Sequence, residues 1–484
     1  MLDTPLTPGR PQLPEGAAER FAAVVGPSHA FTVEADVAPY VAEQRGLLPG
    51  HSPLVLRPGT VEEVAAIVAL ANELDVPVVP QGGNTGLVGG GVPHGAGSGK
   101  PAEVVVALSR MDRVLDVDPA GNTMIVEAGC ILQRAQEAAD EADRLFPLSL
   151  GAQGTAQIGG NIATNAGGTG VLAYGNTRDL VMGLEVVLPT GEVWSRLSRL
   201  RKDNTGYRMA ELFVGAEGTL GIVTKAVLKL FPKPKGREVA LVAVHSPDAA
   251  LALFERARGA AGAQLTAFEL ISRRAFRFTL DFAETRSPLA AEGPWYVLTE
   301  ISSGRSREDA RELLETVLMA AIEGGEASDA VLAESIAQAQ AFWTLREDMS
   351  WSQKPHGASI KHDVSVPVAA IPAFIRDADA AVERVCPGGR VVNFGHMGDG
   401  NLHYNVTKPE GWDDADFLAL YESMNDAVYE VVLAHEGSIS AEHGIGQVKR
   451  ERLAKLKSPV EMDLMRRVKA TFDPKGIMNP GKVL

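Results

Sequence analysis

Residues 151–168 read GAQGTAQIGGNIATNAGG and lie in the most glycine-dense part of the chain. Glycines placed among small Asn and Thr side chains leave consecutive backbone N–H groups accessible, and such groups can surround a pyrophosphate without a lysine. The same residues also suit a set of tight β-turns. The stretch therefore predicts either a nucleotide-binding loop or a cluster of turns.

Other glycine-rich stretches narrow the choice of cofactor. PVVPQGGNTGLVGGG at 77–91 lacks the GxGxxG fingerprint of a Rossmann unit, and direct use of NAD(P) is disfavoured because no second dinucleotide fingerprint is present. GAGSGK at 95–100 resembles a phosphate loop. However, His94 stands where its first glycine is required, and Pro101 replaces the Ser or Thr that would hold magnesium. We expect GAGSGK to be a surface loop.

The composition limits the class of protein. A chain of 484 residues that is 45% hydrophobic and 22% charged predicts a globular protein of two or three domains. The net charge of −15 argues against nucleic acid as a partner, although a local cationic cluster could still bind a small anion. The two cysteines, Cys130 and Cys386, fit no metal or redox spacing, which favours a reducing compartment.

The chain shows no signal peptide and no run of eighteen apolar residues. We therefore expect a cytoplasmic protein without a membrane span.

Hydrophobic periodicity predicts alternating helices and strands with one clear change of texture. Thr60 is the expected N-cap of a helix over 60–75, and a turn at 189–191 is expected to join two strands over 180–194. After Pro232–Lys235 long Ala- and charge-rich helices appear, for instance over 306–325 and 331–348. We expect domains at 1–232, 233–410 and 411–484, the last of them helical.

Three of the ten histidines lie in two glycine-framed stretches, FGHMGDGNLHYN at 394–405 and SISAEHGIG at 438–446. RVVNFGH and LHYNV are expected to form a hairpin that brings His396 and His403, seven residues apart, to one side. Glu442, beside His443, can join them only through the fold. A metal site, an acid/base site and two ordinary turns all remain open from these residues alone.

Taken together, the three glycine-rich stretches, including VGAEGTLGIVTKA at 214–226, resemble in order and spacing the FAD-binding domain of vanillyl-alcohol-oxidase-type flavoproteins. The second half is similar to the branch that holds D-lactate, glycolate and D-2-hydroxyglutarate dehydrogenases, and the likeness runs from about residue 40 to the end. The resemblance implies an α+β fold with a two-subdomain FAD-binding domain, a separate α+β substrate (cap) domain and a helical C-terminal segment.

The resemblance also implies which residues bind FAD. The stretch 81–91 contains no His or Cys, so we expect noncovalent FAD. The expected contacts are the matching residues of the three stretches and one residue near the tail: Pro80, Gly82, Gly83, Asn84, Thr85, Gly86, Leu87, Gly151, Gly154, Thr155, Gly159, Gly160, Asn161, Thr164, Asn165, Gly167, Gly168, Glu217, Gly218, Gly221, Ile222 and Asn479.

For the histidines, the resemblance implies that His396, His403 and Glu442 bind a divalent metal ion, typically Zn²⁺, and that His443 is the general base. A metal bound to the substrate hydroxyl would stabilise the developing alkoxide, and a histidine of near-neutral pKa suits proton transfer. Asn405, two residues beyond His403, is expected on the same face of its strand as a substrate contact.

The substrate carboxylate needs a counter-charge. Arg346 and Ser350, four residues apart on an expected helix, and Lys361 at the start of the next strand resemble the carboxylate contacts of the D-2-hydroxyglutarate branch, where Thr is common in place of Ser350. Composition alone favours a solvated helix end with an Arg–Glu pair, and the resemblance reverses that preference. His362 alternates to the opposite face and is left out of the site.

The expected function is oxidation of D-2-hydroxyglutarate, or a similar D-2-hydroxy acid, to the 2-oxo acid by an FAD- and metal-dependent dehydrogenase. A D-lactate or glycolate dehydrogenase and a non-catalytic flavoprotein subunit are the alternatives. Reduced flavin must pass electrons to an electron-transfer flavoprotein, a quinone or a cytochrome. A homodimer is compatible with the resemblance, because the family often forms dimers.

Overall fold

The computed structural model describes residues 11–484, which form two compact units. The first unit contains the chain up to Gly167, Asn176–Pro232 and Glu442–Leu484, and the second contains Gly168–Gly175 and Lys233–Ala441. Pro232, expected as a boundary, ends a segment of the first unit. Residues 411–441, expected with the C-terminal segment, belong to the second unit, where helix α15 (Tyr421–Ala434) packs on α13 (Ile371–Val385).

The first unit begins with a small sheet of order β1-β2-β4-β3, in which β2, β4 and β3 are parallel. Helix α3 (Val61–Leu74) begins where expected, because the Thr60 hydroxyl accepts a hydrogen bond from the Glu63 N–H at 3.2 Å. Val64, Ile67, Val68 and Ala71 form its buried face. The elements of this part are α1 (Ala17–Val25), β1 (Ala30–Phe31), α2 (Glu34–Val41), β2 (Leu54–Leu56), β3 (Val78–Gln81) and β4 (Val104–Ala107).

A second, antiparallel sheet of the same unit has the order β5-β6-β10-β8-β9. Strands β8 and β9 are the pair expected around the turn at 189–191. The strands are β5 (Val114–Asp118), β6 (Thr123–Glu127), β8 (Val181–Val187), β9 (Val193–Arg196) and β10 (Ile222–Lys229), and β7 (Arg144–Leu145) pairs separately with β11 (Phe231–Pro232). The helices are α4 (Leu132–Glu141), α5 (Ile158–Thr164), α7 (Thr177–Leu180), α8 (Ala210–Phe213), α16 (Arg450–Leu456) and α17 (Pro459–Phe472).

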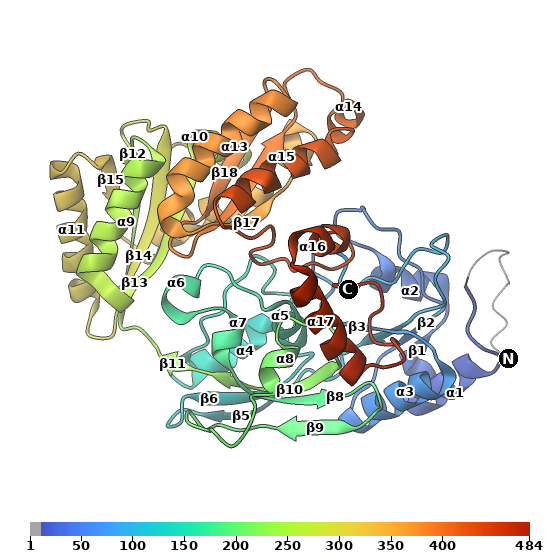
Figure 1. Cartoon of the computed structure of the whole chain (residues 1–484). Helices are drawn as coiled ribbons and strands as arrows, with labels where there is room; N and C mark the ends of the chain where they lie inside the picture. The colour runs from blue at the N-terminus through green and yellow to red at the C-terminus, as the bar shows by residue number, and fades with distance from the viewer. Residues whose placement is uncertain (1–10) are drawn as a thin grey trace. The chain divides into compact units, whose positions relative to one another are not determined.

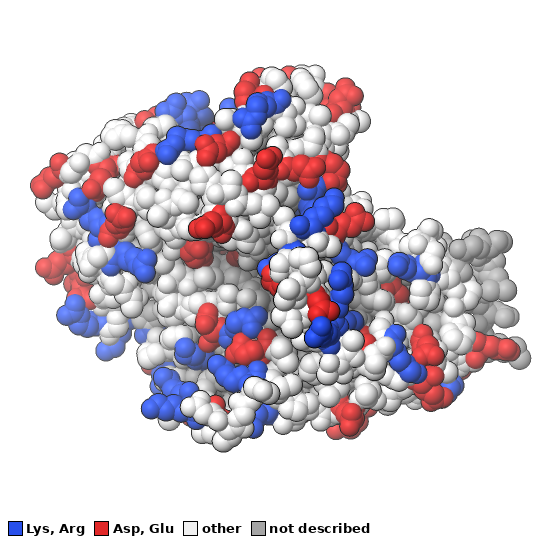
Figure 2. Space-filling view, in the orientation of Figure 1, with Lys and Arg blue, Asp and Glu red and all other residues white. Residues whose placement is uncertain are grey.

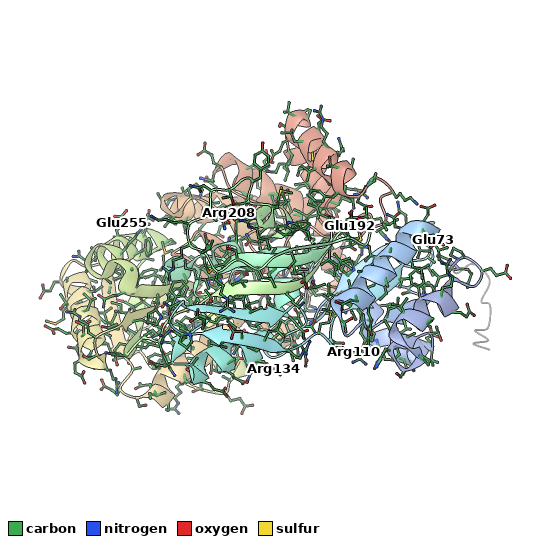
Figure 3. All side chains as sticks on the ribbon, turned by 90° about the horizontal axis from the view of Figure 1, so that it is seen from below. Glu73, Arg110, Arg134, Glu192, Arg208 and Glu255 are labelled. Carbon is green, nitrogen blue, oxygen red and sulfur yellow. The ribbon has the colours of Figure 1, made fainter. Side chains whose placement is uncertain are left out.

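Helix α4 shows why these segments fold as they do. Leu132, Ala135 and Ala139 recur at helical spacing and are buried, while Arg134 is exposed. In Figure 3, Arg134 on α4 and Glu73 on α3 lie at the outside of the first unit. Lys, Arg, Asp and Glu are interspersed over the face drawn in Figure 2.

The second unit is built on one antiparallel sheet of order β15-β12-β14-β13-β18-β19-β16, with β17 also paired to β19. Its strands are β12 (Gly236–Val244), β13 (Leu265–Ser272), β14 (Trp295–Ser303), β15 (Ala327–Leu332), β16 (Ser359–Ile360), β17 (Asp363–Ser365), β18 (Arg390–His396) and β19 (Asn401–Thr407). Its helices are α6 (Val171–Tyr174), α9 (Pro247–Ala261), α10 (Arg273–Phe282), α11 (Arg307–Glu323), α12 (Ile336–Glu347), α13, α14 (Asp414–Leu418) and α15.

Helices cover both faces of this sheet (Figure 1), so its strands are apolar without strict alternation. Along β12, Ala240, Val242 and Val244 pack with residues of α9, α11, α13 and α15. Val239, Leu241 and Ala243, which point the other way, pack with residues of α10 and α12. The α+β class expected from the sequence is confirmed.

Two expected elements differ in the structure. The helix expected over 331–348 begins at Ile336, because Leu332 pairs with Ala240 in the sheet and Ser335 provides the N-cap. The glycine-dense stretch is not wholly a loop, since α5 lies within it. No helix within residues 11–484 is long and apolar enough to cross a membrane, and both cysteines are free and buried.

Candidate active site

The first glycine-rich stretch leaves β3 and is held by side chains at its start. The Gln81 amide donates to the Tyr40 and Gly91 carbonyls, both at 2.7 Å, which closes the loop over 82–91. Asn84 adopts a left-handed φ of 51°, and its amide donates to the Ala42 carbonyl at 2.9 Å. Hydrogen bonds from these side-chain amides to backbone carbonyls therefore hold the loop, and Val88 within it is buried.

The first and second glycine-rich stretches contact each other within the first unit. A Cβ on Gly83 would lie 2.0 Å from the Thr155 carbonyl oxygen, and one on Gly82 would lie 3.5 Å from the Gly160 nitrogen. At Gly83 only glycine permits such an approach of two backbones. The two loops therefore form one continuous backbone-rich surface.

Glu217 and Asn479 connect the third stretch with the tail of the chain. The Glu217 carboxylate accepts hydrogen bonds from the Ile445 and Gly446 N–H groups at 2.7 and 2.8 Å. Burial raises the pKa of Glu217, although these two hydrogen bonds act in the opposite direction. The Asn479 amide donates to the Gly90 carbonyl at 2.8 Å and to the Glu217 carbonyl at 2.7 Å. Both side chains thus connect the third stretch and the tail by hydrogen bonds to backbone groups.

Several features of this surface fit a bound dinucleotide. Within the described residues, the side-chain oxygens of Gln157, Asn161 and Asn479 are buried without a hydrogen-bond donor. Apart from the adjoining residues and the backbone of α5 itself, no atom of residues 11–484 lies within 4 Å of the place that a Cβ on Gly86 or Gly160 would take. A ligand rich in donors and placed against glycine backbone would satisfy both features. The residues present therefore fit the FAD expected from the sequence. All the expected contacts lie in the first unit except Gly168.

In the second unit, the expected hairpin of His396 and His403 is formed by β18 and β19. His396 is the last residue of β18, and His403 pairs with Phe394 across the hairpin. The two imidazole centroids lie 5.6 Å apart, and His396 is buried. A short turn over 397–400 thus places two ring nitrogens side by side.

Glu442 follows directly on Ala441, the last residue of the second unit. The chain before it runs along β17, where Ser365 and Ser438 exchange two backbone hydrogen bonds and the Ala441 N–H reaches the Asp363 carbonyl at 3.4 Å. One ligand atom each of His396, His403 and Glu442 lies within 4.8 Å of the others. Two imidazoles and a carboxylate suit Zn²⁺ or a similar divalent ion.

A neighbouring group consists of Asp363, Glu442 and His443, whose ligand atoms also lie within 4.8 Å of one another. The expected base His443 is thus adjacent to two carboxylates. Asp363 was not expected from the sequence. Its carboxylate accepts a hydrogen bond from the Asn401 amide at 3.0 Å, which fixes one of its oxygens.

Glu269 is a further residue that the sequence did not predict. Its Oε1 lies 2.8 Å from His396 Nδ1, and its Oε2 accepts from Arg346 Nε at 2.8 Å. Burial alone would raise the pKa of Glu269, but its contacts with His396 and Arg346 outweigh burial and hold the pKa at about 2. A single acid within the apolar strand TAFELIS was the only signal in the sequence.

The other expected substrate contacts lie in the second unit. Arg346 is on α12, but it is buried and its guanidinium faces Glu269 and the Phe394 ring. Ser350 is exposed in the turn that follows α12, and Lys361 Nζ lies 3.4 Å from its carbonyl oxygen. Asn405 is buried, and its side-chain oxygen accepts from the His362 N–H at 3.3 Å. Ser350 and Lys361 are therefore neighbours, whereas Arg346 already has a carboxylate partner.

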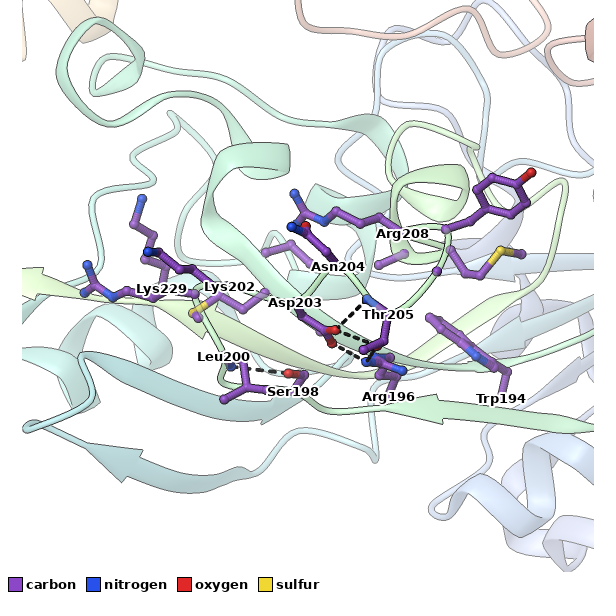
Figure 4. A pocket seen from close by; sticks show the side chains of 18 of the residues that line it. Trp194, Arg196, Ser198, Leu200, Lys202, Asp203, Asn204, Thr205, Arg208 and Lys229 are labelled. Carbon is purple, nitrogen blue, oxygen red and sulfur yellow. Dashed lines mark hydrogen bonds and ion pairs between the residues drawn. The ribbon is translucent and has the colours of Figure 1, made fainter.

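A cavity of about 710 Å³ lies elsewhere in the first unit, beside β8, β9 and the segment 198–210 (Figure 4). Arg196, Arg201, Lys202, Arg208 and Lys229 line it together with Asp179 and Asp203. Hydrogen bonds from Thr205 and Arg196 lower the pKa of Asp203 to about 2. None of the expected site residues lines this cavity.

Comparison with known proteins gives two family matches. Residues 52–195 match the FAD binding domain family, and residues 233–483 match the C-terminal domain of FAD linked oxidases. A protein of Xanthomonas citri pv. viticola, named D-2-hydroxyglutarate dehydrogenase, is 41% identical over 426 residues, which are 88% of each chain. A mitochondrial protein of Arabidopsis thaliana with the same name is 39% identical over 90% of this chain and 75% of its own.

Solved structures of low identity show the fold. p-Cresol methylhydroxylase aligns over 98% of both chains with a TM-score of 0.76 and 17% identity. Alkyldihydroxyacetonephosphate synthase aligns over 98% of this chain and 87% of its own, with a TM-score of 0.74 and 17% identity. Together with the family matches and the similar dehydrogenases, this fold confirms the resemblance inferred from the glycine-rich stretches.

Proposed function

The chain belongs to the family of FAD linked oxidases, and on this premise we propose that it oxidises D-2-hydroxyglutarate to the 2-oxo acid as an FAD-dependent dehydrogenase. The names of relatives in Xanthomonas citri pv. viticola, Stutzerimonas stutzeri and Arabidopsis thaliana support this substrate. The observation that carries the chemistry is the approach of His396, His403 and Glu442 to within 4.8 Å of one another.

FAD is the cofactor of the family, and when bound it accepts the hydride that leaves C2 of the substrate. The residues of this chain that would hold it are the backbone N–H groups of the glycine-rich loops, with Asn161, Gln157 and Asn479 as candidates for polar contacts. The first loop carries neither His nor Cys, which supports noncovalent binding.

We further propose that the protein binds a divalent metal ion, namely Zn²⁺. His396 and His403 would supply imidazole nitrogens and Glu442 a carboxylate oxygen, with further positions left for the substrate. Such an ion would act as a Lewis acid on the substrate hydroxyl. His443, adjacent to Glu442 in the chain, would accept the hydroxyl proton.

Recognition of the dicarboxylate is assigned to the second unit. Lys361 and Ser350, whose contact of 3.4 Å makes them neighbours, would bind a carboxylate, and Asn405 would contribute its amide. Arg346 would contribute less than its charge suggests, because Glu269 neutralises it at 2.7 Å.

The test is anaerobic addition of D-2-hydroxyglutarate to the oxidised protein while the flavin absorbance is followed. We expect bleaching that a chelator prevents and Zn²⁺ restores, and His443→Ala should retain FAD and lose the bleaching. If D-lactate or glycolate bleaches the flavin faster, that acid and not D-2-hydroxyglutarate is the preferred substrate. A flavoprotein inert to every 2-hydroxy acid would favour the non-catalytic subunit.

The remaining proposals concern the setting of the reaction. Electrons would leave the reduced flavin for an electron-transfer flavoprotein, a quinone or a cytochrome. The protein would act in the cytoplasm, and its two free cysteines fit a reducing compartment of this kind. The similar plant protein is mitochondrial by name, so fractionation of cells is the direct check of location. Sedimentation would test for a homodimer.

A further inference from the structure

We propose that Glu269 is a positioning residue that holds His396 in its metal-binding orientation. Its negative charge also couples the metal to Arg346, because it compensates the guanidinium charge beside the metal site. The inference rests on the proposed function, because it concerns the same metal site. The inference assigns a role to Glu269, which neither binds the metal nor contacts the substrate.

The backbone already places Glu269 and His396 opposite each other. They are directly paired residues of β13 and β18 in the antiparallel sheet. Side chains of such a pair project to the same face of the sheet at close range. The contact of 2.8 Å between Glu269 Oε1 and His396 Nδ1 is therefore set by strand register.

The carboxylate selects one form of the imidazole. An ionised carboxylate only accepts hydrogen bonds, so His396 Nδ1 must carry the proton. The Nε2 atom then keeps its lone pair, which is the form that a metal ion requires. Glu269 is 1% exposed and His396 is 7% exposed, so little water competes for the contact.

The second oxygen of Glu269 extends the chain of charges. It lies 2.8 Å from Arg346 Nε and 2.7 Å from Nη2, and Arg346 is also buried. One carboxylate thus compensates a guanidinium that would otherwise repel a cation bound to His396. Loss of the carboxylate would remove the orienting bond and leave Arg346 uncompensated beside the metal site.

The alternative is a buried ion pair that only stabilises the sheet. Metal affinity separates the two roles, because a purely structural pair has no effect on it. Glu269→Gln is the first variant, since glutamine has one acceptor oxygen and cannot serve both His396 and Arg346. Glu300→Gln is the matched control, because Glu300 is likewise buried and paired with an arginine, Arg237, at 2.8 Å.

The experiment measures Zn²⁺ affinity by competition with a chromophoric chelator, on FAD-loaded protein freed of metal. We expect Glu269→Gln to raise the Kd for Zn²⁺ about 10- to 100-fold, and Glu300→Gln to leave it unchanged. A Kd for Glu269→Gln equal to that of the wild type would overturn the inference. Wild-type protein that binds no Zn²⁺ would instead overturn the proposed metal site itself, and the inference with it.

Arg346→Met tests the same coupling from the other end and does not depend on folding of the Glu269 variant. Removal of the guanidinium leaves Glu269 more negative toward the metal, so Zn²⁺ should bind more tightly than in the wild type. Tighter binding in Arg346→Met together with weaker binding in Glu269→Gln supports the coupling, whereas an unchanged or weaker affinity in Arg346→Met contradicts it. Flavin absorbance and thermal unfolding, measured on each variant, show whether it is folded.

Discussion

Gly160→Ala offers a direct test of the FAD surface, because it should change the stability of the FAD-free protein and the affinity for FAD in opposite directions. Gly160 lies inside α5 (Ile158–Thr164), its φ is not left-handed, and no described atom lies within 4 Å of the position that a Cβ would take. The protein alone therefore has room for the methyl group, and only a ligand against this backbone would be displaced by it.

Two effects of opposite sign follow. Replacing glycine by alanine within a helix stabilises it by roughly 0.5–1 kcal/mol, so the FAD-free protein should unfold at slightly higher denaturant concentration. A methyl group forced into a packed contact costs about 1–3 kcal/mol, which corresponds to a roughly 5- to 150-fold weaker Kd for FAD. The variant should thus be more stable without FAD and hold FAD less tightly.

The assay is removal of FAD, urea unfolding of the apoprotein, and titration with FAD followed by quenching of flavin fluorescence. Gly97→Ala is the matched control, because Gly97 also has an open Cβ position but lies in the surface loop 95–100. It should leave the Kd for FAD unchanged. Wild-type affinity in Gly160→Ala would refute the placement of FAD against α5.

Three further predictions concern other contacts. Glu103→Gln should destabilise the protein by about 3–5 kcal/mol in urea unfolding, because it leaves the buried Lys482 ammonium, 3.2 Å away, without its carboxylate partner. Addition of Lys482→Met should recover most of the lost stability, and absence of recovery would count against the ion pair. The pKa of Glu103 is lowered, since the hydrogen bond from His94 and the charge of Lys482 outweigh burial, so its contribution is complete above pH 4.5 and is lost as the pH falls below that value. Glu217→Gln should accelerate hydrogen exchange at the Ile445 and Gly446 amides about tenfold, because glutamine can accept only one of the two bonds; unchanged exchange would argue against the contact. Lys361→Met should raise KM for the acid roughly 10- to 100-fold with flavin content unchanged, as expected for loss of a charge-assisted hydrogen bond, and a wild-type KM would remove Lys361 from the site.

Local signals in the sequence determined much of the secondary structure. Thr60 and the periodic residues after it predicted α3 because an N-cap and its helix are neighbours along the chain. The hairpin of β18 and β19 was predictable for the same reason, since a short turn joins its strands. The start of α12 was not, because Leu332 is drawn into the sheet by β12, whose pairing residue Ala240 is far away in sequence.

The candidate site divides in the same way. The pair His396 and His403 was readable from local spacing, and the glycine-rich stretches identified the cofactor family by their order. The partner of His396 was not readable, since Glu269 is 127 residues distant and enters only through the register of β13 against β18. The same applies to Arg346, which the sequence predicted as a carboxylate contact of the substrate or as part of an Arg–Glu pair at a helix end, and which the fold turns toward the distant Glu269.

The sequence by itself determined the class of fold and the cofactor family and offered His396 and His403 as candidate metal ligands, because each depends on residue types at short spacing. Only the tertiary structure decided which of these groups are already paired. Glu217 is occupied by two backbone amides and Arg346 by a carboxylate, and both contacts span long distances along the chain. Strand pairing and burial determine such contacts, and no local pattern in the sequence encodes them.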